Sequence, residues 1–141
     1  MSKNYEVQYS YDHGDSLFVI YYNGESFVGT AHCHDEDKDM ESERTGLTIA
    51  EARAQIKMKK FIKRYEITPV VNALRHLLAN IQSSKHHDPR AYESCMLRSQ
   101  LAHWENKLEE ITTDIADEEK YLKEYINQKD KLYRKLRARN Q

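Results

Sequence analysis

The stretch "FVGTAHCHDEDKDMESERTGLTIAEARAQIKMKK" (residues 27–60) marks where the chain changes from strand to helix. It opens with β-branched and aromatic residues, which are typical of a strand. A block with six acids and one lysine follows between Asp35 and Glu43, and the stretch ends in a basic helical pattern. The sequence therefore predicts a β part before this corner and an α part after it.

Before the corner, three runs rich in tyrosine and β-branched residues alternate with turn residues. One turn contains Asn23-Gly24, a strong hairpin signal because both residues tolerate positive φ. We expect an antiparallel β-meander over residues 5–33, with helices covering its apolar face because a small isolated sheet is barely stable. The strand runs are "YEVQYSY" (5–11), "SLFVIYY" (16–22) and "SFVGTAHC" (26–33).

After the corner, the pattern is helical. We expect an acidic loop over residues 34–46 and then a helix that starts at 47, with Thr48 as N-cap and Glu51 completing a capping box. Pro69 interrupts this pattern, so residues 47–84 are predicted to form two helices broken at Pro69. A third, long helix is predicted over residues 90–138.

The long helix carries two interleaved series of apolar residues, each with a seven-residue spacing. Such a pattern predicts a coiled-coil seam, and we expect part of it to meet another copy of the chain in a dimer or larger homo-oligomer. Glu118 and Lys129 are the charged members of the seam. The apolar and aromatic members are Leu97, Leu101, Trp104, Leu108, Ile111, Ile115, Leu122, Tyr125, Leu132 and Leu136.

Composition limits the class of protein. The chain has 141 residues, a net charge of −1 and two cysteines, which predicts one α+β domain over residues 1–141 without a disulfide framework. The fold class is a small N-terminal antiparallel β-meander packed on long C-terminal helices that form a helical hairpin or coiled coil. We expect a cytoplasmic protein that binds neither a membrane nor a nucleic-acid polymer.

The corner also contains two histidines around a cysteine. His32 and His34 share one face of the predicted strand, whereas Cys33 points to the other face. This spacing matches no zinc motif, and no nucleophile with an oriented base is recognisable. We therefore expect no metal, no cofactor and no catalytic residue.

Basic residues after the acidic block suggest an anion site. Arg53, Lys57 and Lys60 are helical neighbours on one face, and arginine binds phosphate oxygens through two parallel donors. We name Arg53 as the first candidate ligand contact, followed by Lys57 and Arg44. Phe27, His32 and His34 complete the candidate set. The alternative, that these bases simply balance the nearby acids, stays open.

The pattern from Gly29 ("GTAHCH", then Asp37 and Asp39), followed by "GLTIAEARA" from Gly46, resembles that of the phage-encoded Thoeris anti-defence sponges. These are small proteins with a sheet followed by long helices, and they assemble through their helices. They sequester cyclic ADP-ribose signalling molecules without cleaving them. The resemblance implies a non-enzymatic phage protein that captures a cyclic nucleotide immune signal in the cytoplasm of a bacterial host.

Two other functions stay open. One is a coiled-coil module that binds another protein and no small molecule. The other is a metal-dependent nucleotide enzyme.

Overall fold

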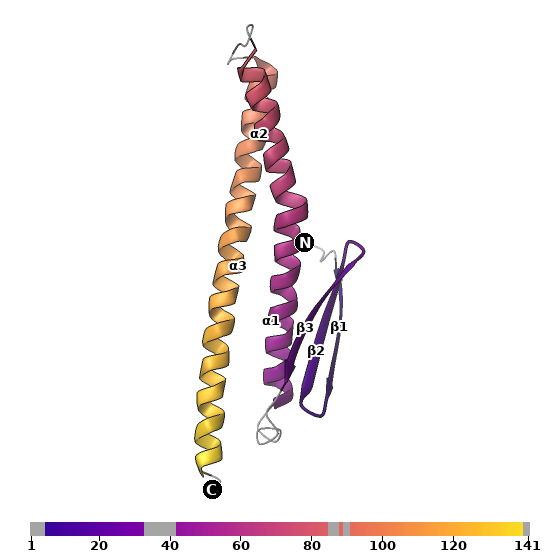
Figure 1. Cartoon of the computed structure of the whole chain (residues 1–141), viewed down its shortest axis with the longest axis vertical. Helices are drawn as coiled ribbons and strands as arrows, with labels where there is room; N and C mark the ends of the chain where they lie inside the picture. Colours follow the sequence, from indigo (N-terminus) through magenta and orange to yellow (C-terminus); the bar gives the residue numbers. More distant parts are fainter. Residues whose placement is uncertain (1–4, 33–41, 85–87, 89–90, 140–141) are drawn as a thin grey trace. The chain divides into compact units, whose positions relative to one another are not determined.

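A computed structural model of the chain describes residues 5–32, 42–84, 88 and 91–139 (Figure 1). Three strands come first, and helices occupy the rest of the described chain, so the protein belongs to the α+β class, as predicted. The elements in order are β1 (Tyr5–Asp12), β2 (Asp15–Tyr22), β3 (Glu25–His32), α1 (Ser42–Ile62), the π-helical segment η2 (Lys63–Ile67), α2 (Thr68–Gln82) and α3 (Tyr92–Arg139).

Contacts divide the chain into two compact units. The first contains Met1–Lys59 and Ile115–Gln141, and the second contains Lys60–Asp114. The sheet, most of α1 and the C-terminal part of α3 belong to the first unit. The second contains η2, α2 and the N-terminal part of α3.

The three strands form one antiparallel sheet in the order β1-β2-β3. Both connections are two-residue turns, because Asp12 pairs with Asp15 and Tyr22 pairs with Glu25. The turn residues all have positive φ, as a type I′ turn requires: His13 48°, Gly14 88°, Asn23 51° and Gly24 79°.

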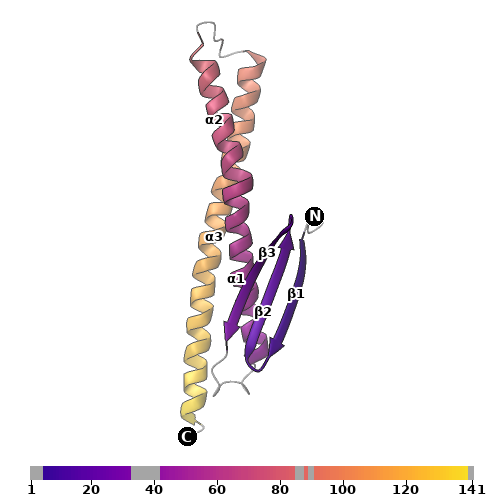
Figure 2. The ribbon, with the colours of Figure 1, turned by 45° about the vertical axis from the view of Figure 1, so that its right-hand side comes forward.

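α1 covers one face of this sheet (Figure 2). The contact is close because small residues meet there. A Cβ atom on Gly29 of β3 would lie 1.8 Å from the backbone oxygen of Ala50 and 2.6 Å from the backbone nitrogen of Ala54. Ala50, Ala54 and Ile20 of β2 are completely buried. Gly29 therefore lets the backbones of β3 and α1 touch.

α1 begins at Ser42, five residues before the predicted start, so residues 42–46 of the expected acidic loop are helical. The prediction that Thr48 caps the helix is wrong. Thr48 lies inside α1, and its hydroxyl donates to the backbone oxygen of Arg44 at 2.8 Å. The sequence suggested a cap because threonine can bond to the backbone at either place. The rest of the expected loop (34–41), with His34, lies outside the described residues, as does Cys33, the last residue of the predicted third strand.

The helical path continues up to Pro69. The five-residue segment η2 joins α1 to α2 without a non-helical residue between them. Pro69 occupies the first turn of α2. Proline fits this position because the first N–H groups of a helix have no intrahelical acceptor. In the second unit, Arg75 of α2 and Glu105 of α3 form an ion pair at 3.1 Å.

The buried side of α3 departs from the predicted seam near its end. Ile115 is buried as expected, but Leu132 is 44% exposed, and the buried residue is the adjacent Tyr133. A straight α-helix turns about 20° per heptad away from a strict seven-residue repeat. Over the heptads after Ile115, this drift moves the buried face from Leu132 towards Tyr133.

No helix among the described residues is both long enough and apolar enough to cross a membrane.

Candidate functional site

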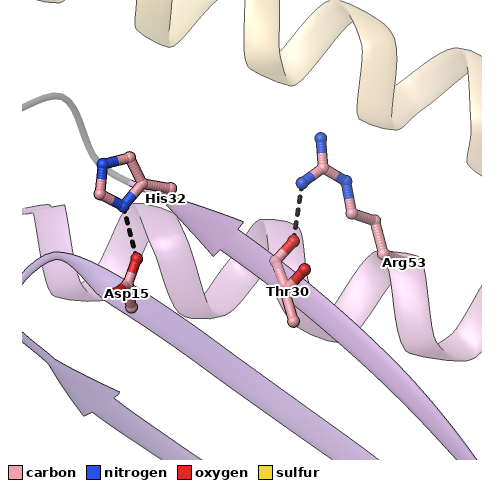
Figure 3. Close-up of polar contacts among 4 residues, drawn as sticks. All are labelled: Asp15, Thr30, His32 and Arg53. Carbon is pink, nitrogen blue, oxygen red and sulfur yellow. Dashed lines mark hydrogen bonds and ion pairs between the residues drawn. The ribbon is translucent and has the colours of Figure 1, made fainter.

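Two of the residues predicted to contact a ligand, Arg53 and Lys57, form hydrogen bonds to the backbone of β3. Arg53 Nη1 donates to the backbone oxygen of Thr30 at 2.7 Å (Figure 3), and Lys57 Nζ donates to that of Val28 at 2.7 Å. The spacings match, because four helical residues rise about 6 Å and two strand residues span about 6.6 Å. Arg53 and Lys57 thus fix α1 along the outer edge of β3.

The other candidates at the corner also have local partners. His32 Nδ1 contacts the carboxyl group of Asp15, its cross-strand neighbour in β2 (Figure 3). Phe27 is half-buried opposite Ile20. His34 falls outside the described residues. Within the described residues, these contacts do not gather Arg53, Lys57, Phe27 and His32 around a shared cavity. The bonds to β3 offer a structural role for Arg53 and Lys57 in place of the predicted ligand role.

Arg44, the remaining candidate, lies at a cleft of about 390 Å³ within the first unit. We call this hollow the α1–α3 cleft, because it lies between the first turns of α1 and the C-terminal part of α3. Its lining consists of Arg44, Thr45, Thr48, Tyr125 and Lys129.

Hydrogen bonds hold the α1 side of this cleft. The Thr48 hydroxyl donates to the Arg44 backbone oxygen, and Tyr133 of α3 donates from its phenolic oxygen to the Thr45 hydroxyl at 2.8 Å. Tyr133 and Thr45 are both buried. The bond therefore joins α3 to α1 directly behind the cleft.

Aromatic rings and a cation form the α3 side. The Lys129 ammonium lies 5.6 Å from the centre of the Tyr125 ring, a distance at which the cation is attracted to the ring. Tyr125 also stacks on Tyr121, with 6.3 Å between the ring centres. These contacts orient Lys129 and Tyr125 at the cleft.

Among the described residues, the lining combines two cations with three hydroxyl groups and includes no carboxylate, histidine or cysteine. Arginine and lysine donate charged hydrogen bonds, and hydroxyl groups add neutral donors. Such a lining suits an anion with several oxygens. Within the described ranges, no group of three or more histidine, cysteine, aspartate and glutamate side chains is placed to hold a metal ion.

The sequence pointed to Arg44 but not to the residues of α3 that line the same cleft. Tyr125 and Lys129 were assigned to the apolar seam of the long helix. The sequence contained one indication that Lys129 has another role, because it is a cation at a position where the seven-residue repeat predicts an apolar residue. The sequence did not show that α1 would bring Arg44 to the same place.

No family model, curated protein or solved structure matches this chain.

Proposed function

We propose that this chain is a phage anti-defence protein that binds a cyclic nucleotide immune signal of the cyclic ADP-ribose type in the bacterial cytoplasm and holds it without cleaving it. The observation that carries this proposal is the convergence of Arg44 and Lys129 at one cleft, together with the ring of Tyr125. The resemblance of the Gly29 and Gly46 motifs to the Thoeris anti-defence sponges supplies the class of ligand.

The chemistry of the α1–α3 cleft supports a phosphate-bearing ligand. Arg44 presents a planar fork that matches phosphate oxygens, and Lys129 adds a second positive charge. A volume of about 390 Å³ lies in the usual range of about 300–1,000 Å³ for small-molecule sites. The Tyr125 ring offers an apolar surface beside the charged groups for the base or ribose.

Sequestration requires tight binding and no chemical step. Hydrolysis of a phosphate or glycosidic bond needs a general base, a nucleophile or a metal ion. The cleft lining offers arginine, lysine, threonine and tyrosine, which favour binding over bond cleavage. In the proposed function, the signal is therefore released intact when the protein unfolds.

The test is mass spectrometry of small molecules released by heating protein purified from cells that make the signal. The proposal predicts an intact cyclic nucleotide, recovered at close to one molecule per cleft from the wild-type protein. Protein with Arg44→Ala and Lys129→Ala should release much less. Recovery of a linearised product, or equal recovery from both proteins, would reject the proposal.

A second candidate, a module that binds another protein, is favoured by exposed apolar side chains along α3. Tyr92 is 75% exposed, Tyr121 64%, Met96 46% and Leu132 44%. A shallow hollow of about 260 Å³ lies along the same helix and is lined by Glu119, Leu122, Lys123, Ile126 and Asn127. Absence of any released nucleotide, together with loss of self-association on Leu132→Glu, would favour this candidate.

A further inference from the structure

The two edges of the sheet differ. On the outer edge of β3, the backbone oxygens of Val28 and Thr30 accept hydrogen bonds from Lys57 and Arg53 of α1. The other edge is β1, six of whose eight residues are exposed. No further strand extends the described sheet beyond β1. An exposed strand edge is a template for pairing with another strand.

The turns define which backbone groups of β1 point outward. Asp12 and Asp15 close a two-residue hairpin, so they form a hydrogen-bonded pair, and such pairs recur at every second residue. Ser10, Gln8 and Glu6 therefore bond to β2. The intervening residues, including Val7 and Tyr9, direct their N–H and C=O groups away from β2.

We infer that β1 pairs in antiparallel orientation with β1 of a second copy, about a two-fold axis at Gln8, to form a continuous six-stranded sheet. In this register, Val7 of each copy lies opposite Tyr9 of the other. Both side chains are exposed in the single chain, Val7 at 44% and Tyr9 at 67%. An aromatic residue opposite a β-branched residue is a favourable cross-strand pair, and the symmetry forms it twice.

Charge selects this register over its neighbours. A two-fold axis at Tyr9 would place Glu6 of one copy opposite Asp12 of the other, and like charges in that position are destabilising. An axis at Val7 would shorten the paired segment to residues 5–9. With the axis at Gln8, Glu6 lies opposite Ser10, and residues 5–11 all pair. Each of these registers also keeps the two α1 helices on one face of the joint sheet.

Proline tests the pairing directly, because it removes one backbone N–H donor. Val7→Pro removes an outward donor and leaves the bonds between β1 and β2 intact. Val28→Pro is the matched control. It removes an outward donor from the β3 edge, and the carbonyl that Lys57 binds remains. Sedimentation equilibrium and circular dichroism are recorded for the wild type and for both variants at 10–100 µM, a range of about tenfold chosen to reveal mass action.

The inference predicts that Val7→Pro halves the molecular mass of the assembly and leaves the circular dichroism spectrum native. Val28→Pro should keep the wild-type mass. A monomeric wild type, or a Val7→Pro protein of unchanged mass, would overturn the inference. If the chain assembles through α3 alone, the Val7→Pro protein should keep the wild-type mass.

Hydrogen exchange on the wild type keeps the inference testable if Val7→Pro fails to fold. The amides of Val7 and Tyr9 should exchange slowly, and more slowly at higher protein concentration, since they bond across the interface. Exchange of these two amides at the unprotected rate would also overturn the inference.

Discussion

Tyr133 donates a hydrogen bond of 2.8 Å to Thr45, a residue 88 positions earlier in the chain, and both side chains are buried. This bond links the C-terminal part of α3 to the first turns of α1. Thr45 lines the α1–α3 cleft beside Arg44, so the bond also supports the wall of the proposed binding site.

Tyr133→Phe should lower the free energy of unfolding by about 1–2 kcal/mol, because the buried Thr45 hydroxyl loses its phenolic partner. Urea denaturation measures the change. Tyr121→Phe is the matched control, since Tyr121 is 64% exposed on the same helix, and its replacement should change stability by less than about 0.5 kcal/mol. Equal effects of the two changes would show that the bond to Thr45 contributes little.

Gly29→Ala should destabilise the protein by about 3 kcal/mol or more. The new methyl group would lie 1.8 Å from the backbone oxygen of Ala50, and backbone atoms move only if α1 separates from β3. Thermal and urea unfolding measure the loss.

Gly24→Ala is the control for that substitution. A Cβ atom there meets nothing within 4 Å, but φ is +79°, so backbone strain alone should cost about 1–2 kcal/mol. If Gly29→Ala were as mild as Gly24→Ala, the close contact between β3 and α1 would be refuted.

Arg53→Ala should reduce stability by about 1 kcal/mol and leave nucleotide affinity within about twofold of wild type. Its guanidinium binds the Thr30 backbone oxygen at an exposed position, where water offsets part of the loss. Urea denaturation and calorimetric titration measure the two quantities. A tenfold loss of affinity with unchanged stability would instead make Arg53 a ligand contact.

Glu118 and Lys59 should show a strong coupling energy. The Glu118 carboxylate pairs with the Lys59 ammonium, and their side chains are only 28% and 22% exposed. The second carboxylate oxygen, Oε2, is buried and has no hydrogen-bond partner among the described residues. Replacing one partner should therefore cost about 1–2 kcal/mol, because the other charge is left in a poorly solvated place.

The double variant Lys59→Met with Glu118→Leu should recover most of that loss, since apolar side chains of similar volume suit the site. A double-mutant cycle from urea denaturation gives the coupling energy. Additive effects of the two single changes would contradict a direct pairing.

Local signals in the sequence were sufficient for the β part of the fold. Asn23-Gly24 specifies a tight hairpin through its backbone preferences, and that turn sets the register of two strands. The alternation of buried and exposed residues in β2 follows from the same pattern. The order of sheet and helices was predictable for this reason.

The helical part depended more on tertiary contacts. Leu132 fits a seven-residue repeat, yet Tyr133 is buried in its place, because the helix drifts from the repeat and Thr45 provides a partner for the phenol. Similarly, Arg53 and Lys57 were recognisable as a basic helix face. Their acceptors on β3 became evident only once Gly29 had brought α1 against that strand.

The candidate site was the least predictable feature. Arg44 and Lys129 are 85 positions apart, and each has an ordinary local interpretation as a neutralising base or a charged seam residue. Only the folded arrangement of α1 and α3 places them at one cleft. A periodic pattern within one helix contains no information about a cation on another.

Titration calorimetry with cyclic ADP-ribose tests the central claim most directly. Wild type should bind the nucleotide, and Lys129→Met should weaken binding about tenfold to a hundredfold, which corresponds to losing one charged hydrogen bond of about 1.5–3 kcal/mol. Lys131→Met, an exposed neighbour outside the cleft lining, serves as the control and should bind like wild type. Absence of binding to the wild type, or equal affinity of the Lys129→Met and Lys131→Met proteins, would contradict the claim that the α1–α3 cleft captures the signal.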